Sequence, residues 1–211
     1  QVIAADQVIN DDVIVRGSEC VGLDCVNGEN FGFDTVRLKE NNVRLVFIDT
    51  SSSASFPRGD WQIRANDSSN GGDNFLSFDD LGDNAGNGSS ISTSPFRVEA
   101  GAPNHALYVD AQGDVGFGTN NPVLELHASN GDTPTLRLEQ NGSSGWTPQA
   151  WDLAGNETNF FIRDLTNGSK LPFRIRPDAP TNSINIEGVT GDTGFGTASP
   201  TASAHIQRNN G

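Results

Sequence analysis

The sequence repeats itself internally, and this repeat limits the architectures open to the chain more than any other feature. The block TVRLKEN at 35–41 recurs as TLRLEQN at 135–141, and GDVGFGT at 113–119 recurs as GDTGFGT at 191–197. Between these blocks the order of proline, tryptophan, aromatic and arginine residues is kept. Repetition over such a distance is typical of chains built from copies of one structural unit.

The repeat predicts two β-rich units that follow an N-terminal segment. We expect the first unit over 35–134 and a shorter second unit over 135–211, with residues 1–34 as an extended arm that carries a disulfide loop. The positions that agree between the copies are mainly apolar residues, Trp, Gly and Pro, which serve core filling and chain reversal. This agreement favours a structural role over a catalytic one.

Short runs of alternating apolar residues predict the strands. Val43, Leu45 and Phe47 form one such run, and Leu136 and Leu138 form another. A period of two places successive side chains on opposite faces of a strand. Asn-Gly pairs separate the runs and supply the positive φ angles of tight hairpin turns. We therefore expect an all-β fold of tandem repeat units, each a sandwich or a prism, without amphipathic helices.

The composition and the motifs exclude several functions. The net charge of −14, from 27 acidic and 13 basic residues, would repel a nucleic-acid backbone. No apolar run reaches the length of about 18 residues that a transmembrane helix needs. The three histidines accompany neither a G-x-S-x-G nor an H-E-x-x-H motif, so we expect no enzyme. Paired acids such as Asp79 and Asp80 leave a polysaccharide-acting enzyme as the remaining catalytic alternative.

The two cysteines, Cys20 and Cys25, lie close together in the run ECVGLDC. In an oxidising compartment they are predicted to form one local disulfide, with free thiols or bridges between chains as the alternatives. The sequence begins with Gln1, which we interpret as the start of a mature secreted chain, a processed fragment being the alternative. We expect a secreted protein, extracellular or on a cell surface.

Apolar residues are also concentrated ahead of the repeat. Such an arm must be covered, either by the first repeat of its own chain or by pairing as a strand with a neighbouring subunit. The second arrangement would extend head to tail and produce fibres. The apolar residues of the arm are Val2, Ile3, Val8, Ile9, Val13, Ile14 and Val15.

The segment GDVGFGTNNPVLELHA at 113–128 resembles the G-x-V-G-I-G-T-x-x-P-x-x-x-L-H-V signature of bacterial secreted surface proteins and phage tail-fibre proteins. GDTGFGTASPTASAHI at 191–206 is similar, with Ala204 in place of the Leu before the histidine. The resemblance implies a β-rich, repetitive, extended structure, commonly trimeric, with a structural or adhesive role. The motif residues are Gly116, Phe117, Gly118, Thr119, Pro122 and His127 in the first copy and Gly194, Phe195, Gly196, Thr197, Pro200 and His205 in the second.

Three weaker ligand sites follow from residue type alone. His127 and His205 would be metal ligands along a symmetry axis or, alternatively, packed histidines near a chain interface. Trp146 has no tryptophan partner in the other copy, which makes it the candidate for a glycan contact. Two oxygen-rich loops without EF-hand spacing suggest calcium or, alternatively, solvated acidic loops. Their candidate ligands are Asp67, Asp73, Asp79 and Asp83, and we expect no other cofactor.

These observations predict a secreted, extracellular structural protein. Its copies would self-assemble into a fibre, a filament or a trimeric appendage through β-strand and subunit contacts. The alternative is an adhesin or carbohydrate-binding module of a bacterial surface or phage tail fibre, with surface glycans as its partner.

Overall fold

The computed structural model describes residues 8–53, 55–83 and 93–207. Within these ranges the chain is all-β, as predicted, with sixteen strands in five sheets, none of which closes on itself. The described residues contain no helix that is long and apolar enough to cross a membrane. The chain divides into two compact units, 1–102 and 103–211.

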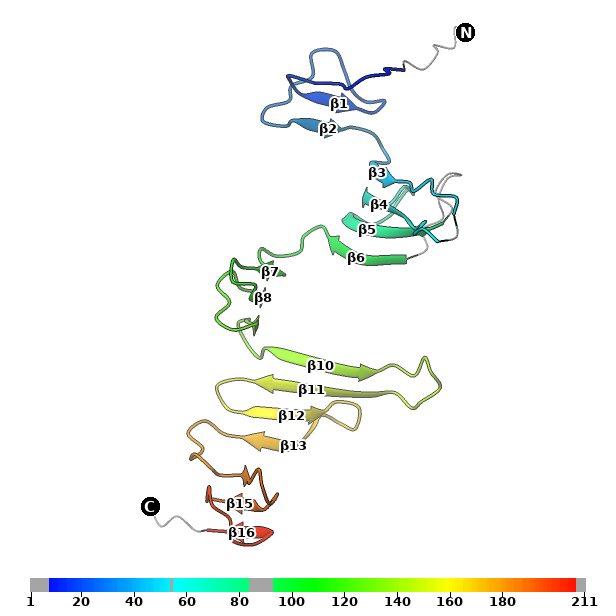
Figure 1. The fold of residues 1–211 in the computed structure, drawn as a ribbon. Helices are drawn as coiled ribbons and strands as arrows, with labels where there is room; N and C mark the ends of the chain where they lie inside the picture. Colours follow the sequence, from blue (N-terminus) through cyan, green and yellow to red (C-terminus); the bar gives the residue numbers. More distant parts are fainter. Residues whose placement is uncertain (1–7, 54, 84–92, 208–211) are drawn as a thin grey trace. The chain divides into compact units, whose positions relative to one another are not determined.

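The first unit contains a parallel strand pair and a four-stranded antiparallel meander (Figure 1). The parallel pair is β1 (Glu19–Val21) with β2 (Val36–Leu38). The meander has the strand order β3-β4-β5-β6, so that each strand pairs with the next one along the chain. Its strands are β3 (Arg44–Phe47), β4 (Asp60–Ala65), β5 (Phe75–Gly82) and β6 (Thr93–Glu99).

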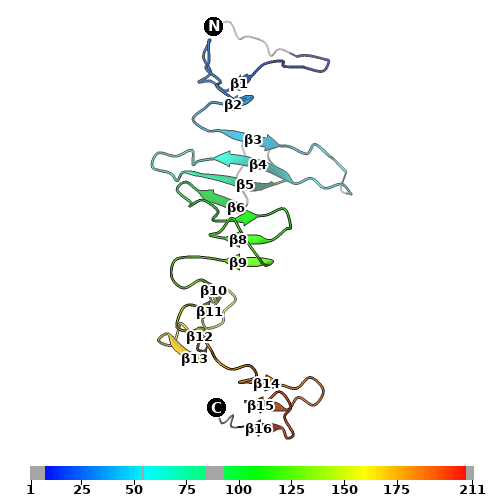
Figure 2. The same cartoon turned by 90° about the vertical axis from the view of Figure 1, so that its left-hand side faces the viewer.

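The second unit contains another four-stranded meander, preceded and followed along the chain by a three-stranded sheet (Figure 2). The meander consists of β10 (Thr135–Gln140), β11 (Gln149–Gly155), β12 (Phe160–Asp164) and β13 (Lys170–Ile175). The sheet before it consists of β7 (Tyr108–Val109), β8 (Val115–Phe117) and β9 (Leu126–Ala128). The sheet after it consists of β14 (Asn185–Ile186), β15 (Thr193–Phe195) and β16 (Ala204–Ile206).

The two three-stranded sheets have the same topology. In each, the first strand pairs antiparallel with the second, and the second pairs parallel with the third. The parallel partners are joined by short connections, 118–125 and 196–203, which contain no helix. These connections are shorter than the crossover of a dozen or more residues that usually joins parallel strands.

Two of the Asn-Gly pairs form the hairpin turns that were expected of them. Gly142 and Gly168 have φ angles of 82° and 87° and lie in the β10–β11 and β12–β13 connections. The pair at 130–131 instead joins β9 to β10, which belong to different sheets. The pair at 87–88 lies outside the described residues.

The matching of the blocks at 35–41 and 135–141 does not hold in the structure. The first block contains β2, which pairs parallel with β1, whereas the second contains β10, the edge strand of an antiparallel meander. By its pairing, β3 is the counterpart of β10, because Phe47 lies opposite Trp61 as Leu138 lies opposite Trp151. The strand β1 also lies within the segment 1–34 that was expected to be an arm.

Few apolar side chains are buried in the described residues. The buried hydrophobic residues are Phe75, Leu81, Ala150, Ala154 and Phe161. The buried polar or charged residues are Asp60, Gln62, Arg64, Ser77, Asp79 and Asp152. The distribution is the reverse of an ordinary globular core, where buried charged groups are rare.

Candidate functional site

One face of the β3–β6 meander is an exposed apolar surface. A continuous row crosses the sheet, because Leu45 lies opposite Ile63, which lies opposite Phe78, which lies opposite Phe96. The rings of Phe78 and Phe96 meet edge to face, with centroids 5.7 Å apart. All members of this face except the half-buried Ile63 are 42–53% exposed. We call this set apolar face 1: Leu45, Phe47, Trp61, Ile63, Leu76, Phe78, Phe96 and Val98.

The β10–β13 meander has a corresponding surface. Leu136 lies opposite Leu153, and the row continues across Ile162 and Phe173. Its members are 36–60% exposed, apart from the half-buried Leu153 and Ile162. We call this set apolar face 2: Leu136, Leu138, Trp151, Leu153, Phe160, Ile162, Phe173 and Ile175.

The opposite face of the first meander is built around a buried carboxylate. Asp79 on β5 is fully buried, and its Oδ2 accepts hydrogen bonds from Gln62 Nε2 at 2.7 Å and from Arg64 Nε at 2.9 Å. The Ser94 hydroxyl donates to Oδ1 of the same carboxylate. Burial favours a higher pKa for Asp79, but these hydrogen bonds outweigh it and hold the pKa below its usual value.

Two arginines complete this polar face by covering the ring of Phe75. The guanidinium carbons of Arg97 and Arg64 lie 3.9 Å and 4.7 Å from the ring centroid. A cation over an aromatic face is attracted to it, and the guanidinium stays hydrogen-bonded to acids at the rim. Arg97 bonds Asp73 in this way, at 2.7 Å. The buried aromatic ring on this face is therefore covered by the chain's own side chains.

The second meander has an analogous network on the face opposite apolar face 2. Asp152 on β11 is fully buried and lies between arginines from the two neighbouring strands. Arg137 donates from Nε at 2.8 Å and Nη2 at 3.2 Å, and Arg163 donates from Nε at 3.0 Å and Nη2 at 2.6 Å. The hydrogen bonds of Arg137 and Arg163 lower the pKa of Asp152 to about 2.

Each meander thus has one polar face that carries buried ion pairs and one exposed apolar face. The polar faces pair their buried acids within one chain, whereas the described residues leave both apolar faces open to water. Fully burying a large apolar side chain stabilises a protein by about 1.5–3 kcal/mol. Covering a side chain that is still half-exposed would therefore add roughly 1 kcal/mol of stabilisation. Contiguous exposed apolar patches occur at sites that bind other proteins, membranes or ligands.

The glycine motif makes a tight turn after the middle strand of each three-stranded sheet. A Cβ on Gly116 would lie 2.3 Å from the carbonyl oxygen of Thr119, and one on Gly194 would lie 2.4 Å from that of Thr197. Gly118 and Gly196 follow with φ angles of 78° and 79°. The motif therefore encodes a backbone turn that only glycine permits, and this turn starts the parallel connection.

The remaining motif residues lie in the same two sheets. Pro122 is buried within the 118–125 connection, and Pro200 is half-buried in the other. His127 lies opposite Gly116, and His205 lies opposite Gly194. The His205 Nδ1 accepts a hydrogen bond from the Thr201 amide at 3.2 Å, whereas the His127 Nδ1 is buried without a partner. Phe117 and Phe195 remain 47% and 40% exposed.

The four acids suggested as calcium ligands are all paired with arginine. Asp67 and Asp79 both contact Arg64, while Asp73 contacts Arg97 and Asp83 contacts Arg58. The described residues contain no group of three or more His, Cys, Asp or Glu side chains arranged to hold a metal ion. The geometry directs these carboxylates to ion pairs within the chain.

The tryptophans occupy two kinds of position. Trp61 and Trp151 belong to apolar faces 1 and 2. Trp146 lies in the β10–β11 connection and is 71% exposed, the most exposed of the three. This placement keeps it available to an external ligand.

The N-terminal apolar residues are exposed where the structure describes them. Val8, Ile9, Val13, Ile14 and Val15 are 52–84% exposed and belong to no strand. Val2 and Ile3 lie outside the described residues.

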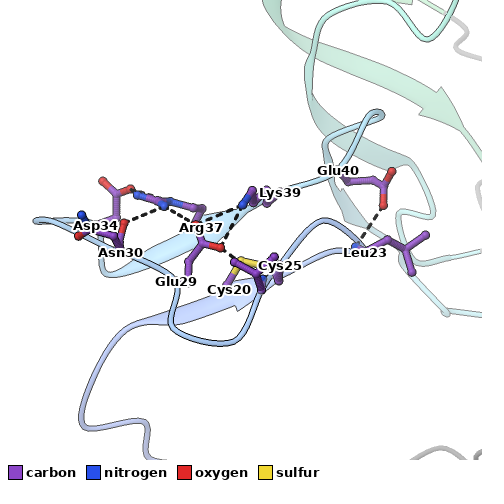
Figure 3. The surroundings of a disulfide bond; sticks show 10 residues. Cys20, Leu23, Cys25, Glu29, Asn30, Asp34, Arg37, Lys39 and Glu40 are labelled. Atoms are coloured by element: carbon purple, nitrogen blue, oxygen red, sulfur yellow. Dashed lines mark hydrogen bonds and ion pairs between the residues drawn. A yellow bond between two sulfur atoms is a disulfide. The ribbon is translucent and has the colours of Figure 1, made fainter.

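Cys20 and Cys25 are joined in a disulfide beside a cluster of charged side chains (Figure 3). The Glu29 carboxylate contacts Arg37 Nη1 at 2.7 Å and Lys39 Nζ at 3.0 Å. Hydrogen bonds from Lys39 and Arg37 lower the pKa of Glu29. These contacts attach the connection between β1 and β2 to the second strand.

Sequence reasoning did not identify the ion pairs on the strands. Arg37, Arg97 and Arg137 each contact an acid. The burial of Asp79 and Asp152 was missed. The available signal was an acid alternating with apolar residues in the runs FLSFDDL and AWDLA.

The chain matches no protein-family model, and neither the comparison with curated proteins nor that with solved structures finds a relative.

Proposed function

We propose that this protein is a secreted structural protein whose copies assemble through apolar faces 1 and 2 into a fibre, a filament or a trimeric appendage. The observation that carries the proposal is the exposure of a contiguous set of Leu, Phe, Ile, Val and Trp side chains on one face of each meander. A soluble single chain rarely leaves a contiguous patch of this kind uncovered.

Further copies of the same chain are the partner that best suits these faces. Each chain offers two faces of matched composition, and both lie on four-stranded meanders of the same topology. We infer that the meanders are tandem copies of one unit. Like apolar faces can pack on one another under rotational symmetry, with Asp80 opposite Trp61 and Asp164 opposite Trp151 as the charged residues on these faces.

Open sheet edges offer a second type of subunit contact. In the described residues β3, β6, β10 and β13 are edge strands of their sheets. An edge strand presents unpaired backbone groups to which another chain can add a strand. The apolar residues at 8–15 are a candidate for such a strand, in line with the head-to-tail arrangement expected from the sequence.

The secreted location is part of the same proposal. A disulfide within a small, two-stranded parallel pair persists in an oxidising compartment and is rare in a reducing one. The role proposed here is mechanical, with no catalytic step.

The test is the solution mass of the native chain together with a pair of matched variants. We expect light scattering to give a multiple of 22.4 kDa and electron microscopy to show elongated particles or filaments. Leu136→Glu places a charge on apolar face 2 and should shift the mass towards the monomer. Thr135→Glu places the same charge one residue away on the opposite face of β10 and should leave the mass unchanged.

Two results would contradict the proposal. One is a native chain that is monomeric at all concentrations, as it would be if its own two units covered each other. The other is an equal loss of assembly in both variants, which would assign the effect to charge and not to the apolar face.

A second candidate function is glycan binding, which the exposure of Trp146 favours. Exposed aromatic rings on β structures can stack on sugar rings, and this residue lies in a connection outside both apolar faces. A glycan array with the native chain and Trp146→Ala would decide between the functions. Binding that this variant loses, with its assembly intact, would support an adhesin.

A further inference from the structure

The parallel pair β1–β2 has the same pairing as two other strand pairs of the chain. In β8–β9 the register places Gly116 opposite His127, in β15–β16 Gly194 opposite His205, and in β1–β2 Cys20 opposite Arg37. Each pairing covers three residues on each strand. The sequence repeat matched the block that contains β2 with the block that contains β10, and it did not identify the pair β1–β2.

The backbone hydrogen bonds at the ends of the three pairs also correspond. The amide after the second strand donates to the last residue of the first strand in each case. The distances are 2.8 Å from Lys39 to Val21, 2.9 Å from Ser129 to Phe117 and 2.9 Å from Gln207 to Phe195. Amides at the start of the pairs correspond as well, with Glu19 bonding Thr35, Val115 bonding Glu125, and Thr193 bonding Ser203.

A glycine follows the first strand in all three pairs. A Cβ on Gly22 would lie 2.1 Å from the carbonyl oxygen of Lys39, and one on Gly118 would lie 2.4 Å from that of Ser129. Gly196 occupies the third position, with a φ angle of 79°. The pair β1–β2 therefore has the same close backbone approach at Gly22 as the pair β8–β9 has at Gly118.

The three pairs differ at the middle residue of the first strand. Gly116 and Gly194 leave room for the carbonyl of a tight turn, but the corresponding residue of β1 is Cys20, which is bonded to Cys25. The connection that follows is also longer, spanning 22–35 instead of 118–125 or 196–203. A longer flexible connection costs more entropy to close.

The first pair also lacks the flanking strand that supports the other two. β8 and β15 each have an antiparallel neighbour, β7 and β14, whereas β1 pairs only with β2 within the described residues. It therefore has fewer backbone hydrogen bonds to hold it in place.

We infer that the Cys20–Cys25 disulfide is a redox-sensitive switch that replaces the glycine turn and holds β1 against β2. Closing the loop from Cys20 to Cys25 limits the conformations open to the unpaired chain, and this favours the paired strand. Reduction releases β1, while the contacts of Glu29 with Arg37 and Lys39 keep the rest of the connection attached to β2 (Figure 3). The other two pairs contain no cysteine and do not respond.

The redox step requires a dithiol reductant. Two thiolate–disulfide exchanges break the bond between the two sulfur atoms, and the cysteines take up two electrons and two protons to become thiols. The reductant is oxidised to its cyclic disulfide. Reoxidation by a disulfide donor reverses the reaction.

The test is amide hydrogen exchange of the full chain with and without dithiothreitol, followed by mass spectrometry of peptides. We expect the amides of Glu19 and Lys39 to exchange faster by about tenfold or more after reduction, a size consistent with loop closure by a short disulfide. The amides of Ser129 and Gln207, which make the equivalent bonds, serve as internal controls and should not change. The double variant Cys20→Ser with Cys25→Ser should exchange as the reduced chain does, with or without reductant.

Two outcomes would overturn the inference. Unchanged exchange at Glu19 and Lys39 after reduction would show that the strand pair holds without the bond. Faster exchange at all three pairs together would show that the disulfide supports the whole fold and not this pair.

Discussion

The variant Asp152→Asn tests whether the polar face of the second meander holds its strands together. The native carboxylate is fully buried and accepts four hydrogen bonds from Arg137 and Arg163. An amide at this position has one acceptor oxygen, and its NH₂ group would point at arginine donors. The substitution therefore removes the charge and leaves donors without acceptors, at nearly constant volume.

The magnitude follows from the pKa and from the exposure of the arginines. The pKa of Asp152 falls from 3.8 to about 2, a difference that corresponds to about 2 kcal/mol. The side chains of Arg137 and Arg163 are 48% and 31% exposed, so water screens the pair and reduces this contribution to about 1 kcal/mol. The mismatched amide adds about 1–2 kcal/mol. We expect a loss of roughly 2–3 kcal/mol at neutral pH.

The assay is urea unfolding followed by tryptophan fluorescence, since Trp151 is adjacent to the substituted residue. Glu157→Gln is the matched control, because it neutralises an exposed acid between β11 and β12 and should change the free energy of unfolding by less than about 0.5 kcal/mol. The native carboxylate has a lower pKa folded than unfolded, so its contribution is present above the unfolded value of 3.8 and is lost as the pH falls towards about 2. The difference between the native chain and Asp152→Asn should shrink over that range.

An effect of Asp152→Asn as small as that of Glu157→Gln would refute this reasoning, because the paired carboxylate would then be replaceable by water. A difference that stays constant between pH 5 and pH 2 would refute the electrostatic origin and leave only the shape of the side chain.

Two further predictions concern the turns and the N-terminal strand pair. Gly116→Ala should destabilise the β7–β9 sheet by about 2 kcal/mol or more, because the added Cβ would meet the Thr119 carbonyl oxygen. Gly131→Ala is the control and should be nearly neutral, because the added Cβ lies in open space. Thermal unfolding of the two variants compares their stabilities. Glu29→Gln should remove the acid sensitivity of the β1–β2 amides. Because the pKa of Glu29 is lowered in the folded chain, its contribution to the stability of this pair is present above about pH 4.5 and is lost at lower pH. Hydrogen exchange of these amides at pH 6 and pH 3 measures the effect. An acid response that persists in Glu29→Gln would point to another group.

Strand content could be predicted because it depends on local sequence. The run at Val43, Leu45 and Phe47 ends in β3, and the run at Leu136 and Leu138 lies in β10. Turn chemistry was equally local, since Gly142 and Gly168 reach positive φ in hairpins as the Asn-Gly pairs predicted. Side-chain alternation and glycine's backbone freedom depend on only a few consecutive residues. Strands and turns can therefore be predicted without knowledge of the partner strand.

Strand partners could not be predicted in the same way. The blocks at 35–41 and 135–141 share four of their seven residues, yet one contains a strand of a parallel pair and the other a strand of an antiparallel meander. A strand-forming segment can make its backbone hydrogen bonds with any adjacent strand of suitable register. The rest of the fold determines which strand lies beside it. For the same reason the resemblance between β1–β2 and β8–β9 is visible in hydrogen bonds and not in the sequence.

By itself the sequence determined an all-β chain with glycine turns, paired cysteines and alternating apolar residues. The sequence did not show which face of each meander would carry the buried ion pairs and which would remain apolar and exposed. Only the tertiary structure placed Asp79 and Asp152 beside arginines from neighbouring strands and so assigned the buried side to polar residues. The physical reason is that a carboxylate is tolerated in a buried site only where donors converge on it, and convergence depends on strand register and not on composition.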